Sequence, residues 1–336
     1  MRKNRSLASI LSGAAASRLG FWTRAGLALA LAALFAYAET VSIAAVQKSK
    51  PASKASQTAG SLTVRTGPRA AVWLDEVRRG TTDESGTLTI RKVSAGRHTL
   101  RVRAAGFREA TVQIPAARRG AFEVRLVTTT DEAELAFQEA EEAREKARDD
   151  EAKQRAAELY RKALALRPRN PAAHVGLARV LLDLNEHREA LAEITAAREA
   201  RPVYPEASAV EGRVYRAMAF EGRAIESYQR AIREARGFQP EAHTGLGILY
   251  EEKGMYDEAA ASFKKALAQL SDSEPVVYQL LGSVYEKQEK YKEAVAAYEK
   301  YLALAPDGSL AEAVRSVIEQ LRSQATGQNA PPPCCD

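Results

Sequence analysis

Four prolines recur along the second half of the chain at nearly constant spacing. Pro171, Pro205, Pro240 and Pro275 are 34, 35 and 35 residues apart. A period of this length is typical of repeat architectures in which each unit is one supersecondary motif. One such unit cannot bury its apolar face alone, so neighbouring units must stack to form a core. The spacing therefore predicts an all-α solenoid, which we place over residues 131–325.

Small and large side chains recur at fixed positions within these units. Glycine inside a helix costs about 1 kcal/mol relative to alanine, so its recurrence requires a compensating contact. Close approach of paired helices is such a contact, because a small residue leaves space for a large neighbour. We predict structural roles for small residues of the first helices (Ala178, Gly212, Gly247, Gly282), small residues of the second helices (Ala190, Ala224, Ala259, Ala294) and large residues four positions later (Tyr228, Phe263, Tyr298).

The period and the recurring small residues together resemble the tetratricopeptide repeat family. The resemblance implies helix–turn–helix units that bind a protein or peptide partner in a concave groove lined by the first helices. The residues that it places on this groove are Arg179, Asp183, Arg213, Arg216, Glu251, Glu252, Gln279, Ser283, Glu286 and Lys287.

Arginine dominates the earlier part of the expected groove, and glutamate dominates the later part. We therefore expect an extended or helical partner segment with acidic residues towards Arg213. The alternative, in which these charges are solvated and unused, stays open. The lysine and asparagine set by which chaperone-binding members of the family clamp a C-terminal carboxylate is missing here, so that function is not carried over.

Both ends of the helical region differ from the central repeats. Residues 131–155 read either as a degenerate first repeat or as a long connecting helix, with Thr129 and Glu132 resembling a capping box at its start. After Pro306, an amphipathic segment through Leu310, Val314, Ile318 and Leu321 predicts a capping helix.

The chain ends in a polar tail, residues 326–336, for which we expect disorder. Its adjacent Cys334 and Cys335 are the two cysteines of the chain. A vicinal disulfide, an intermolecular bridge and free thiols all stay open for this pair.

Residues 61–127 show a different pattern, in which apolar and polar residues alternate. Pairs such as Leu62 and Val64, or Leu100 and Val102, lie two positions apart within short runs bounded by glycine or proline. This period is typical of half-buried antiparallel strands. About six such strands within fewer than 70 residues predict a small all-β sandwich.

The order of features in this region resembles the PEGA domain family. The matching stretches are "SLTVRTGP", "AVWLDEVRRG", "VSAGRHTLRVRAAGF" and "FEVRLV". The chain departs from the family pattern at Ala95, where proline is usual, and at Glu76, where glycine is usual. Related carboxypeptidase-regulatory-like sandwiches have a similar pattern. The resemblance implies a non-catalytic accessory or adhesion-type module. The fold class that we expect for the chain is multidomain, with a PEGA-like β-sandwich followed by an all-α tetratricopeptide solenoid.

Residues 1–46 have the features of a targeting segment. Five basic residues and no acidic residue precede the apolar run Ala25 to Ala38, which ends in the motif Ala-Tyr-Ala. A basic region, an apolar core and such a motif predict a secretory signal peptide. An uncleaved membrane anchor is the alternative, although Glu39 would then lie within the span. Residues 47–60 form a polar linker, and we expect the remainder to lie in the periplasm or cell envelope, in the second case anchored to the inner membrane.

Charge is unevenly distributed along the chain, whose overall net charge is +6. Residues 61–127 hold 13 Lys and Arg against six Asp and Glu, whereas the region after residue 127 is acidic. A basic face of this kind can contact an anionic glycan, a lipid surface or nucleic acid, or can be merely solvated. Nucleic-acid binding is not expected for this chain, and membrane contact is expected only through the N-terminal segment.

The sequence contains no pattern that indicates catalysis. It has no glycine-rich phosphate loop, nucleophile elbow or HExxH motif, and no spaced cluster that would hold a metal. Two of its four histidines, His174 and His243, occupy the same position of successive repeats, which favours a structural role. We therefore expect no catalytic residue, metal or cofactor.

Two functions agree with these features. The preferred one is an exported, non-enzymatic scaffold or adaptor whose solenoid binds a protein partner. The alternative is an envelope accessory protein whose basic β-domain binds an anionic glycan or lipid surface.

Overall fold

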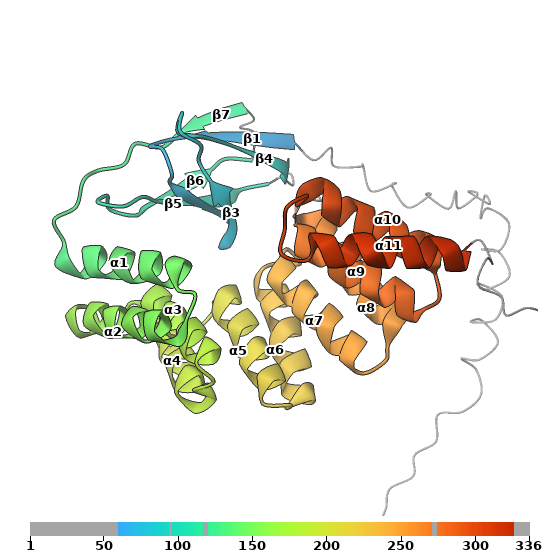
Figure 1. Ribbon diagram of the computed structural model, residues 1–336. Helices are drawn as coiled ribbons and strands as arrows, with labels where there is room; N and C mark the ends of the chain where they lie inside the picture. The colour runs from blue at the N-terminus through green and yellow to red at the C-terminus, as the bar shows by residue number, and fades with distance from the viewer. Residues whose placement is uncertain (1–59, 94–95, 117–119, 271–273, 326–336) are drawn as a thin grey trace, which may run out of the picture. The chain divides into compact units, whose positions relative to one another are not determined.

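The computed structural model describes residues 60–93, 96–116, 120–270 and 274–325 (Figure 1). The targeting segment, nearly all of the linker and the C-terminal tail predicted above lie outside these residues. The strands are β1 (Gly60–Arg65), β2 (Ala71–Leu74), β3 (Val77–Thr81), β4 (Thr87–Val93), β5 (His98–Arg103), β6 (Ala110–Ile114) and β7 (Gly120–Glu123).

These strands form two sheets, in the orders β4-β1-β7 and β3-β2-β5-β6. All neighbouring strands pair antiparallel except β1 and β7, which are parallel, with Val64 opposite Phe122. The prediction of purely antiparallel pairing is therefore wrong at this edge. The reason is that β6 lies in the other sheet, so the chain crosses between sheets before β7 joins β1.

The core of the sandwich lies between the two sheets. The alternating positions that the sequence assigned to one face of each strand supply it, including Leu62, Val64, Leu100 and Val102, each at most 4% exposed. Phe122 from β7 closes the same cluster. The result confirms a small all-β region before the helices.

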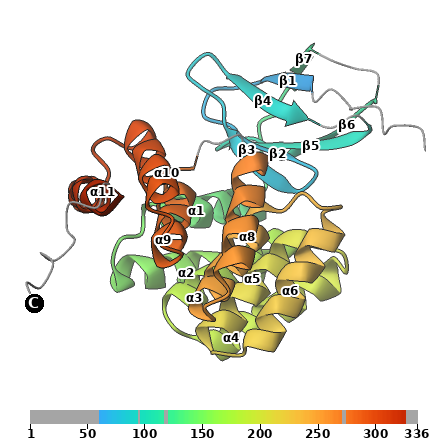
Figure 2. The same ribbon diagram turned by 90° about the vertical axis from the view of Figure 1, so that its right-hand side faces the viewer.

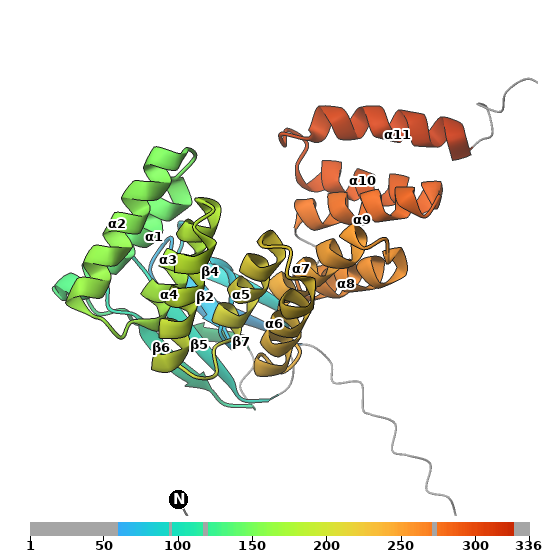
Figure 3. The same cartoon turned by 90° about the horizontal axis from the view of Figure 1, so that it is seen from below.

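Eleven helices follow within the described residues, and Figures 2 and 3 show them from two further sides. They are α1 (Glu132–Lys146), α2 (Asp150–Leu166), α3 (Pro171–Asp183), α4 (His187–Ala200), α5 (Pro205–Ala217), α6 (Glu221–Glu234), α7 (Pro240–Glu252), α8 (Tyr256–Gln269), α9 (Pro275–Lys287), α10 (Tyr291–Leu304) and α11 (Ala311–Ala325).

Each of the four recurring prolines is the first residue of a first helix: Pro171 of α3, Pro205 of α5, Pro240 of α7 and Pro275 of α9. Proline suits this position because its missing N–H would have no partner within the helix, and its fixed φ matches the helix. Each first helix packs against the following second helix, and successive pairs stack in chain order.

The first unit is a helix pair, not a long connecting helix, since α1 ends at Lys146 and α2 begins at Asp150. The residue that caps α1 is Asp131, whose carboxylate accepts from the N–H groups of Ala133 and Glu134. The capping box predicted at Thr129 is therefore wrong; its hydroxyl instead accepts from the N–H of Asp131. At the other end, Leu310 lies just before α11 and is 44% exposed, so it is not part of the capping face.

Aromatic side chains of the second helices fill the space beside glycines of the first helices. A Cβ atom at Gly212 or Gly245 would lie 2.6 Å or 2.3 Å from the Tyr228 ring, and one at Gly247 would lie 2.5 Å from Phe263. Contacts this short are sterically forbidden, so only glycine fits. Gly245 lies two residues before Gly247 in the same helix. The sequence analysis predicted a packing role for Gly247 but not for Gly245.

The strands and helices described here all belong to one compact unit, residues 57–336. Among the described residues, no helix is both long and apolar enough to cross a membrane.

Candidate functional site

Arg179 of α3 is the centre of an ion-pair network on the first helices. Its Nη1 and Nη2 donate hydrogen bonds to Oε1 and Oε2 of Glu241, both at 2.8 Å, and Nη2 lies 3.4 Å from Oε1 of Glu206. Burial alone would lower the pKa of Arg179, but the charges of Glu241 and Glu206 raise it. Burial alone would raise the pKa of Glu241, but Arg179 lowers it. The network therefore joins α3, α5 and α7.

Arg213 of α5 has only longer contacts with carboxylates. Its Nη2 lies 3.7 Å from Oδ1 of Asp183, and its Nη1 lies 3.6 Å from Oε1 of Glu241. Hydrogen bonds to oxygen are shorter than this, and 35% of the Arg213 side chain is exposed. Its N–H groups therefore remain available to another acceptor.

Successive first helices are joined by a second set of contacts. Arg216 Nη1 donates to Oε1 of Glu252 at 2.7 Å. One repeat further along, Lys287 Nζ and Ser283 Oγ donate to Oε1 of Glu251, at 2.8 Å and 3.0 Å. The arginine-rich and glutamate-rich parts of the expected groove thus pair with each other across repeats.

The remaining positions named from the sequence are Glu286 and Gln279 of the expected groove and the small residues assigned to packing. Glu286 Oε2 accepts from the Tyr298 hydroxyl at 3.1 Å, whereas Gln279 is partly buried and has no polar contact among the described residues. The small residues of the second helices and of α3 are fully buried: Ala178, Ala190, Ala224, Ala259 and Ala294.

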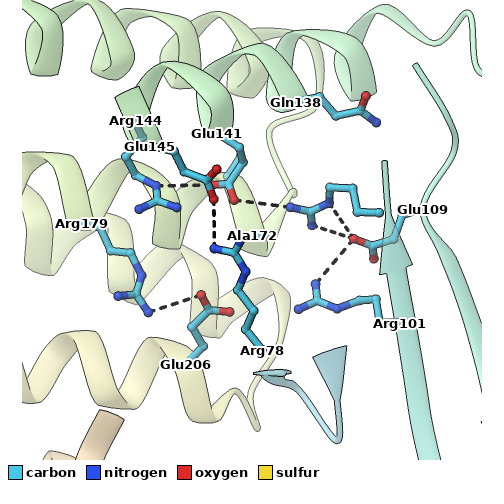
Figure 4. Close-up of polar contacts among 12 residues, drawn as sticks. Arg78, Arg101, Glu109, Gln138, Glu141, Arg144, Glu145, Ala172, Arg179 and Glu206 are labelled. Atoms are coloured by element: carbon cyan, nitrogen blue, oxygen red, sulfur yellow. Dashed lines mark hydrogen bonds and ion pairs between the residues drawn. The ribbon is translucent and has the colours of Figure 1, made fainter. Parts of the chain in front are cut away.

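The β-sandwich contributes residues that the sequence did not indicate (Figure 4). Arg101 and Arg103 of β5 are 7% and 8% exposed, although strand alternation predicts solvated side chains there. Both lie near Oε2 of Glu109, at 3.6 Å and 2.6 Å, and Arg103 Nη1 lies 3.5 Å from Oε2 of Glu141 in α1. The second face of this sheet is therefore covered by helix α1.

Further contacts hold the β-sandwich against the repeats. Arg78 of β3 donates to Oε1 of Glu145 at 2.9 Å. Gln138 of α1 accepts from the N–H of Gly106 and donates to the carbonyl of Phe107, both at 2.8 Å. No sequence signal marks these residues, because their partners lie far away along the chain.

The turn between β2 and β3 places Glu76 beside the loop between α4 and α5. Asp75 and Glu76 have φ of 51° and 67°, a left-handed conformation that is unfavourable for residues with a side chain. Arg201 Nη1 and Nη2 contact both carboxylate oxygens of Glu76, at 3.1 Å and 2.7 Å. Arg101 lies 3.6 Å away on the other side. Glu76, one of the two positions at which the sequence departs from the PEGA-like pattern, thus forms a contact between the sandwich and the helices.

A cavity of about 490 Å³ lies between this turn and the first helices. Its polar lining includes Arg179, Arg213, Arg216 and Glu241, and its apolar lining includes Val77, Ile248 and Val277. The first helices α1, α3, α5, α7 and α9 and the β2–β3 hairpin therefore form a single concave site, hereafter the groove cavity.

Two donors lining the groove cavity have no acceptor. Among the described residues, the buried Tyr228 hydroxyl and the buried Arg216 Nε have no acceptor, although the Arg216 side chain lies close enough to the hydroxyl oxygen to lower the pKa of Tyr228. Burial raises the pKa of Tyr228 to about 12 despite the nearby charge of Arg216. In the equivalent position of another repeat, the Tyr298 hydroxyl has a carboxylate partner. Buried donors are rarely left unpaired, so this site has hydrogen-bonding capacity for an acceptor from outside.

His174 and His98 have hydrogen-bond partners, whereas Nε2 of His187 is buried without one among the described residues. His174 Nδ1 contacts Glu193 Oε2 at 2.6 Å, and its Nε2 contacts the Pro168 carbonyl at 2.8 Å. His98 Nδ1 contacts Asp75 Oδ2 at 2.6 Å. Among the residues with described positions, no group of His, Cys, Asp and Glu is arranged to hold a metal ion.

Three solved structures are similar to the helical region. A thermophilic tetratricopeptide protein of Thermus thermophilus, TTC0263, has 24% identity and a TM-score of 0.48, covering 56% of this chain and 98% of that one. PilF of Pseudomonas aeruginosa has 16% identity and a TM-score of 0.47, with coverage of 59% and 93%. YrrB, described as a tetratricopeptide protein with an unusual peptide-binding site, has 22% identity and a TM-score of 0.38, with coverage of 56% and 94%.

No curated protein matches the chain. Family models described as tetratricopeptide repeat match residues 147–214 and residues 240–307. These two stretches contain the helix pairs that begin at Pro171 and at Pro240. Together with the proline period, the two matches confirm tetratricopeptide repeats in the helical region of this chain.

Proposed function

We propose that the protein is a non-enzymatic scaffold that binds a segment of a partner protein in the groove cavity. Proteins of tetratricopeptide repeats are generally scaffolds for protein interactions, which supports the general class. The observation that carries the specific proposal is the pair of buried donors without acceptors, Tyr228 and Arg216, in a cavity of about 490 Å³.

The chemistry of the cavity favours an acidic side chain on the partner. Arg213, with no carboxylate closer than 3.6 Å, adds a cation to the two unpaired donors. A carboxylate would satisfy all three, and charge-assisted hydrogen bonds of this kind are stronger than neutral ones. Val77, Ile248 and Val277 line the same cavity and suit an apolar residue next to the acidic one. Arg179 is less available, because Glu241 and Glu206 already accept its hydrogen bonds.

Site-specific photo-crosslinking tests this proposal in the full chain. A photoreactive amino acid at Ile248, within the cavity, should capture a discrete partner in the source cells. The same group at Phe220, which is 48% exposed and outside the cavity, is the control. Equal adducts from both positions, or none from Ile248, would contradict binding in the groove cavity.

The captured partner then allows a test of the individual contacts. Tyr228→Phe and Arg213→Gln should each weaken binding of the partner segment about tenfold, the loss of one charge-assisted hydrogen bond. Arg188→Gln, at an exposed position of the second helix α4, is the charge-matched control and should bind normally. Unchanged affinity in both cavity variants would show that the charges of the first helices serve only the solenoid.

Export is a separate proposal, supported by the basic and apolar segments of residues 1–46 and by the Ala36-Tyr37-Ala38 motif. It places the protein in the periplasm or cell envelope, with cleavage after Ala38 preferred to an uncleaved anchor. Mass spectrometry of the protein purified from its source should find Glu39 as the N-terminus. An intact N-terminus in the membrane fraction would support the anchor, and an intact N-terminus in the cytoplasm would contradict export.

The role of the β-sandwich is likewise a proposal. Its sequence stretches support a PEGA-like accessory module, and its contacts through Glu76 and Gln138 support a role in shaping the groove cavity. On this proposal the sandwich contributes one wall of the partner site.

A further inference from the structure

A second cavity, of about 520 Å³, lies on the other side of the β2–β3 hairpin. Strands β3 and β4 form one wall. Phe238 of the loop between α6 and α7, Gln269 at the end of α8, and Leu270 and Glu274 between α8 and α9 form the other. We call it the arginine cavity, since three arginines line it, together with threonines, apolar residues and one carboxylate: Arg78, Arg79, Arg91, Thr81, Thr89, Gly80, Ile90, Phe238, Leu270, Gln269 and Glu274.

Two of the three guanidinium groups have no carboxylate partner among the described residues. Arg78 is paired with Glu145 at 2.9 Å. Arg79 makes no ion pair, and its guanidinium carbon lies 3.5 Å from the centre of the Phe238 ring. Arg91 is exposed and also makes no ion pair in the described part of the chain. Two positive charges therefore face this cavity without a fixed counter-charge.

The polar atoms at the back of the cavity are also unsatisfied. Arg79 Nε and Gln269 Oε1 are buried and have no hydrogen-bond partner among the residues that the structure describes. The other amide atom of Gln269, Nε2, donates to the carbonyl of Gly237 at 2.8 Å, which fixes the side chain. A buried charged group without a counter-ion is costly. In agreement with this, burial lowers the pKa of Arg79 to about 10, despite the nearby charge of Asp75.

Within the described part of the chain, one carboxylate, Glu274, lines the cavity, but it does not neutralise these arginines. It makes no ion pair within the described residues, and burial raises its pKa. The described lining thus carries three cations and one anion. An anionic ligand with hydrogen-bond acceptors is the chemistry that would complete the site.

We propose that the arginine cavity binds a phosphate group, either as inorganic phosphate or as a phosphomonoester. Two unpaired guanidinium groups match the charge of a phosphate dianion better than that of a single carboxylate. The planar fork of arginine can bind two phosphate oxygens at once. In hydrogen phosphate, the P–OH group can also donate to Gln269 Oε1, whereas the dianion of a monoester has no such donor. The cavity exceeds the size of a bare phosphate, and Ile90, Phe238 and Leu270 provide apolar lining for the organic part of an ester.

This site is distinct from the groove cavity, although Arg78, Leu270 and Glu274 line both. Its ligand does not depend on the identity of the partner proposed above. The two proposals can therefore fail independently.

Calorimetric titration of the full chain distinguishes the sources of the phosphate. The probes are inorganic phosphate, glycerol 3-phosphate, and phosphatidylcholine vesicles with and without phosphatidic acid. A free-ligand site predicts saturable 1:1 binding of either small probe. A membrane-facing site predicts binding to vesicles only when phosphatidic acid is present. Absence of binding to all probes would overturn the proposal.

Three variants test the contacts. Arg79→Gln and Arg91→Gln should each weaken binding of the best probe about tenfold or more, since each removes a charge-assisted contact. Arg65→Gln, at an exposed position of β1 in the same basic sandwich, has the same change in charge and should bind normally. Because Arg91 is exposed, its variant should fold even if Arg79→Gln does not, as circular dichroism would show. Equal loss in Arg65→Gln and Arg91→Gln would reveal a general charge effect and overturn the site.

Discussion

Arg179 in α3 and Glu241 in α7 form a two-point hydrogen-bonded ion pair across a whole repeat. Both N–O distances are 2.8 Å, although the residues are 62 positions apart. Their side chains are 17% and 31% exposed. The pair bypasses α5, which lies between them in the chain and supplies Glu206 to the same guanidinium. It therefore links three repeats, where ordinary stacking joins only neighbours.

Removing one member of this pair should destabilise the solenoid. Arg179→Met leaves Glu241 partly buried without its partner and should cost about 2 kcal/mol, allowing for partial solvent screening. The double variant Arg179→Met, Glu241→Met should be more stable than either single variant, because neither member of the pair is then left without the other. Urea unfolding of all four proteins gives the coupling free energy. Additive effects would show that the pair contributes nothing beyond its separate side chains.

Gly247 should not tolerate alanine despite the higher helix propensity of alanine. The added Cβ would lie 2.5 Å from Phe263, and overpacking of this kind costs about 1–3 kcal/mol. Gly222 in α6 has no atom within 4 Å of such a Cβ, so Gly222→Ala should be neutral or stabilise by up to about 1 kcal/mol. Thermal unfolding of both variants measures the contrast, and equal effects would refute a steric role for Gly247.

The hydroxyl groups of two equivalent tyrosines should contribute differently to stability. Tyr298→Phe removes a 3.1 Å hydrogen bond to Glu286 and should cost about 1 kcal/mol. Tyr228→Phe removes a buried hydroxyl that has no partner, so its stability should stay the same or rise. Chemical unfolding compares the two. A loss in Tyr228→Phe as large as that in Tyr298→Phe would mean that its hydroxyl is already satisfied within the chain.

Glu76 should stabilise the protein although its backbone is strained. Replacing it with glycine relieves a φ of 67° but removes the contacts with Arg201 and Arg101. We expect a net loss of about 1–2 kcal/mol, since Arg201 loses its carboxylate partner and Arg101 loses one of its counter-charges. Glu289→Gly is the control, because Glu289 has a φ of 58° and is exposed without an ion pair in the described residues. The free energy of unfolding of that variant should rise by up to about 1 kcal/mol. A similar rise in Glu76→Gly would show that the contacts of Glu76 do not stabilise the protein.

His174 and His243 should respond to pH in opposite directions. Burial opposes protonation of His174, but hydrogen bonds to Glu193 and to the Pro168 carbonyl raise its pKa. Burial and then Lys265 lower the pKa of His243. A raised histidine pKa stabilises the fold below the unfolded value of about 6.5, and this contribution is lost as pH rises through the folded pKa. For the lowered pKa of His243, the contribution is present above about pH 6.5 and is lost as pH falls towards the folded value.

The corresponding variants provide the measurement. The free energy lost in His174→Gln should be larger near pH 5.5 than near pH 8.5, and the loss in His243→Gln should change in the opposite sense. Glu193→Gln should reproduce the pH dependence of His174→Gln, because it removes the same charged contact. Parallel pH profiles for the two histidine variants would contradict the assignment.

Local and periodic features of the fold were predictable from the sequence. The recurring prolines marked the first residues of α3, α5, α7 and α9, because proline fits the start of a helix and few other places within one. Strand alternation predicted the core of the sandwich, as at Val64 and Val102. The same alternation predicted that Arg101 and Arg103 would be exposed to solvent, and this prediction is wrong. A sheet face that carries polar residues can still be covered by another element, here by helix α1.

The candidate site was only partly predictable. The family resemblance indicated which charged residues lie on the first helices, but not that Arg179 is occupied by Glu241 while Arg213 remains available. Nor did any local pattern indicate that Glu76 reaches Arg201, 125 positions away. Distances of this kind depend on how every intervening repeat packs.

The sequence by itself determined the repeat period, the helix pairs, the small β-region and the residues whose size the packing requires. The alternation of buried and exposed positions follows the period of the helix or strand, so it can be recognised from the order of residues in the sequence. Only the tertiary structure decided which charges neutralise one another. It left Arg79 without an ion pair among the described residues and gave Arg213 only contacts of 3.6 Å or more. The physical reason is that electrostatic pairing depends on distance in space, and the solenoid and sandwich bring together side chains that the sequence keeps far apart.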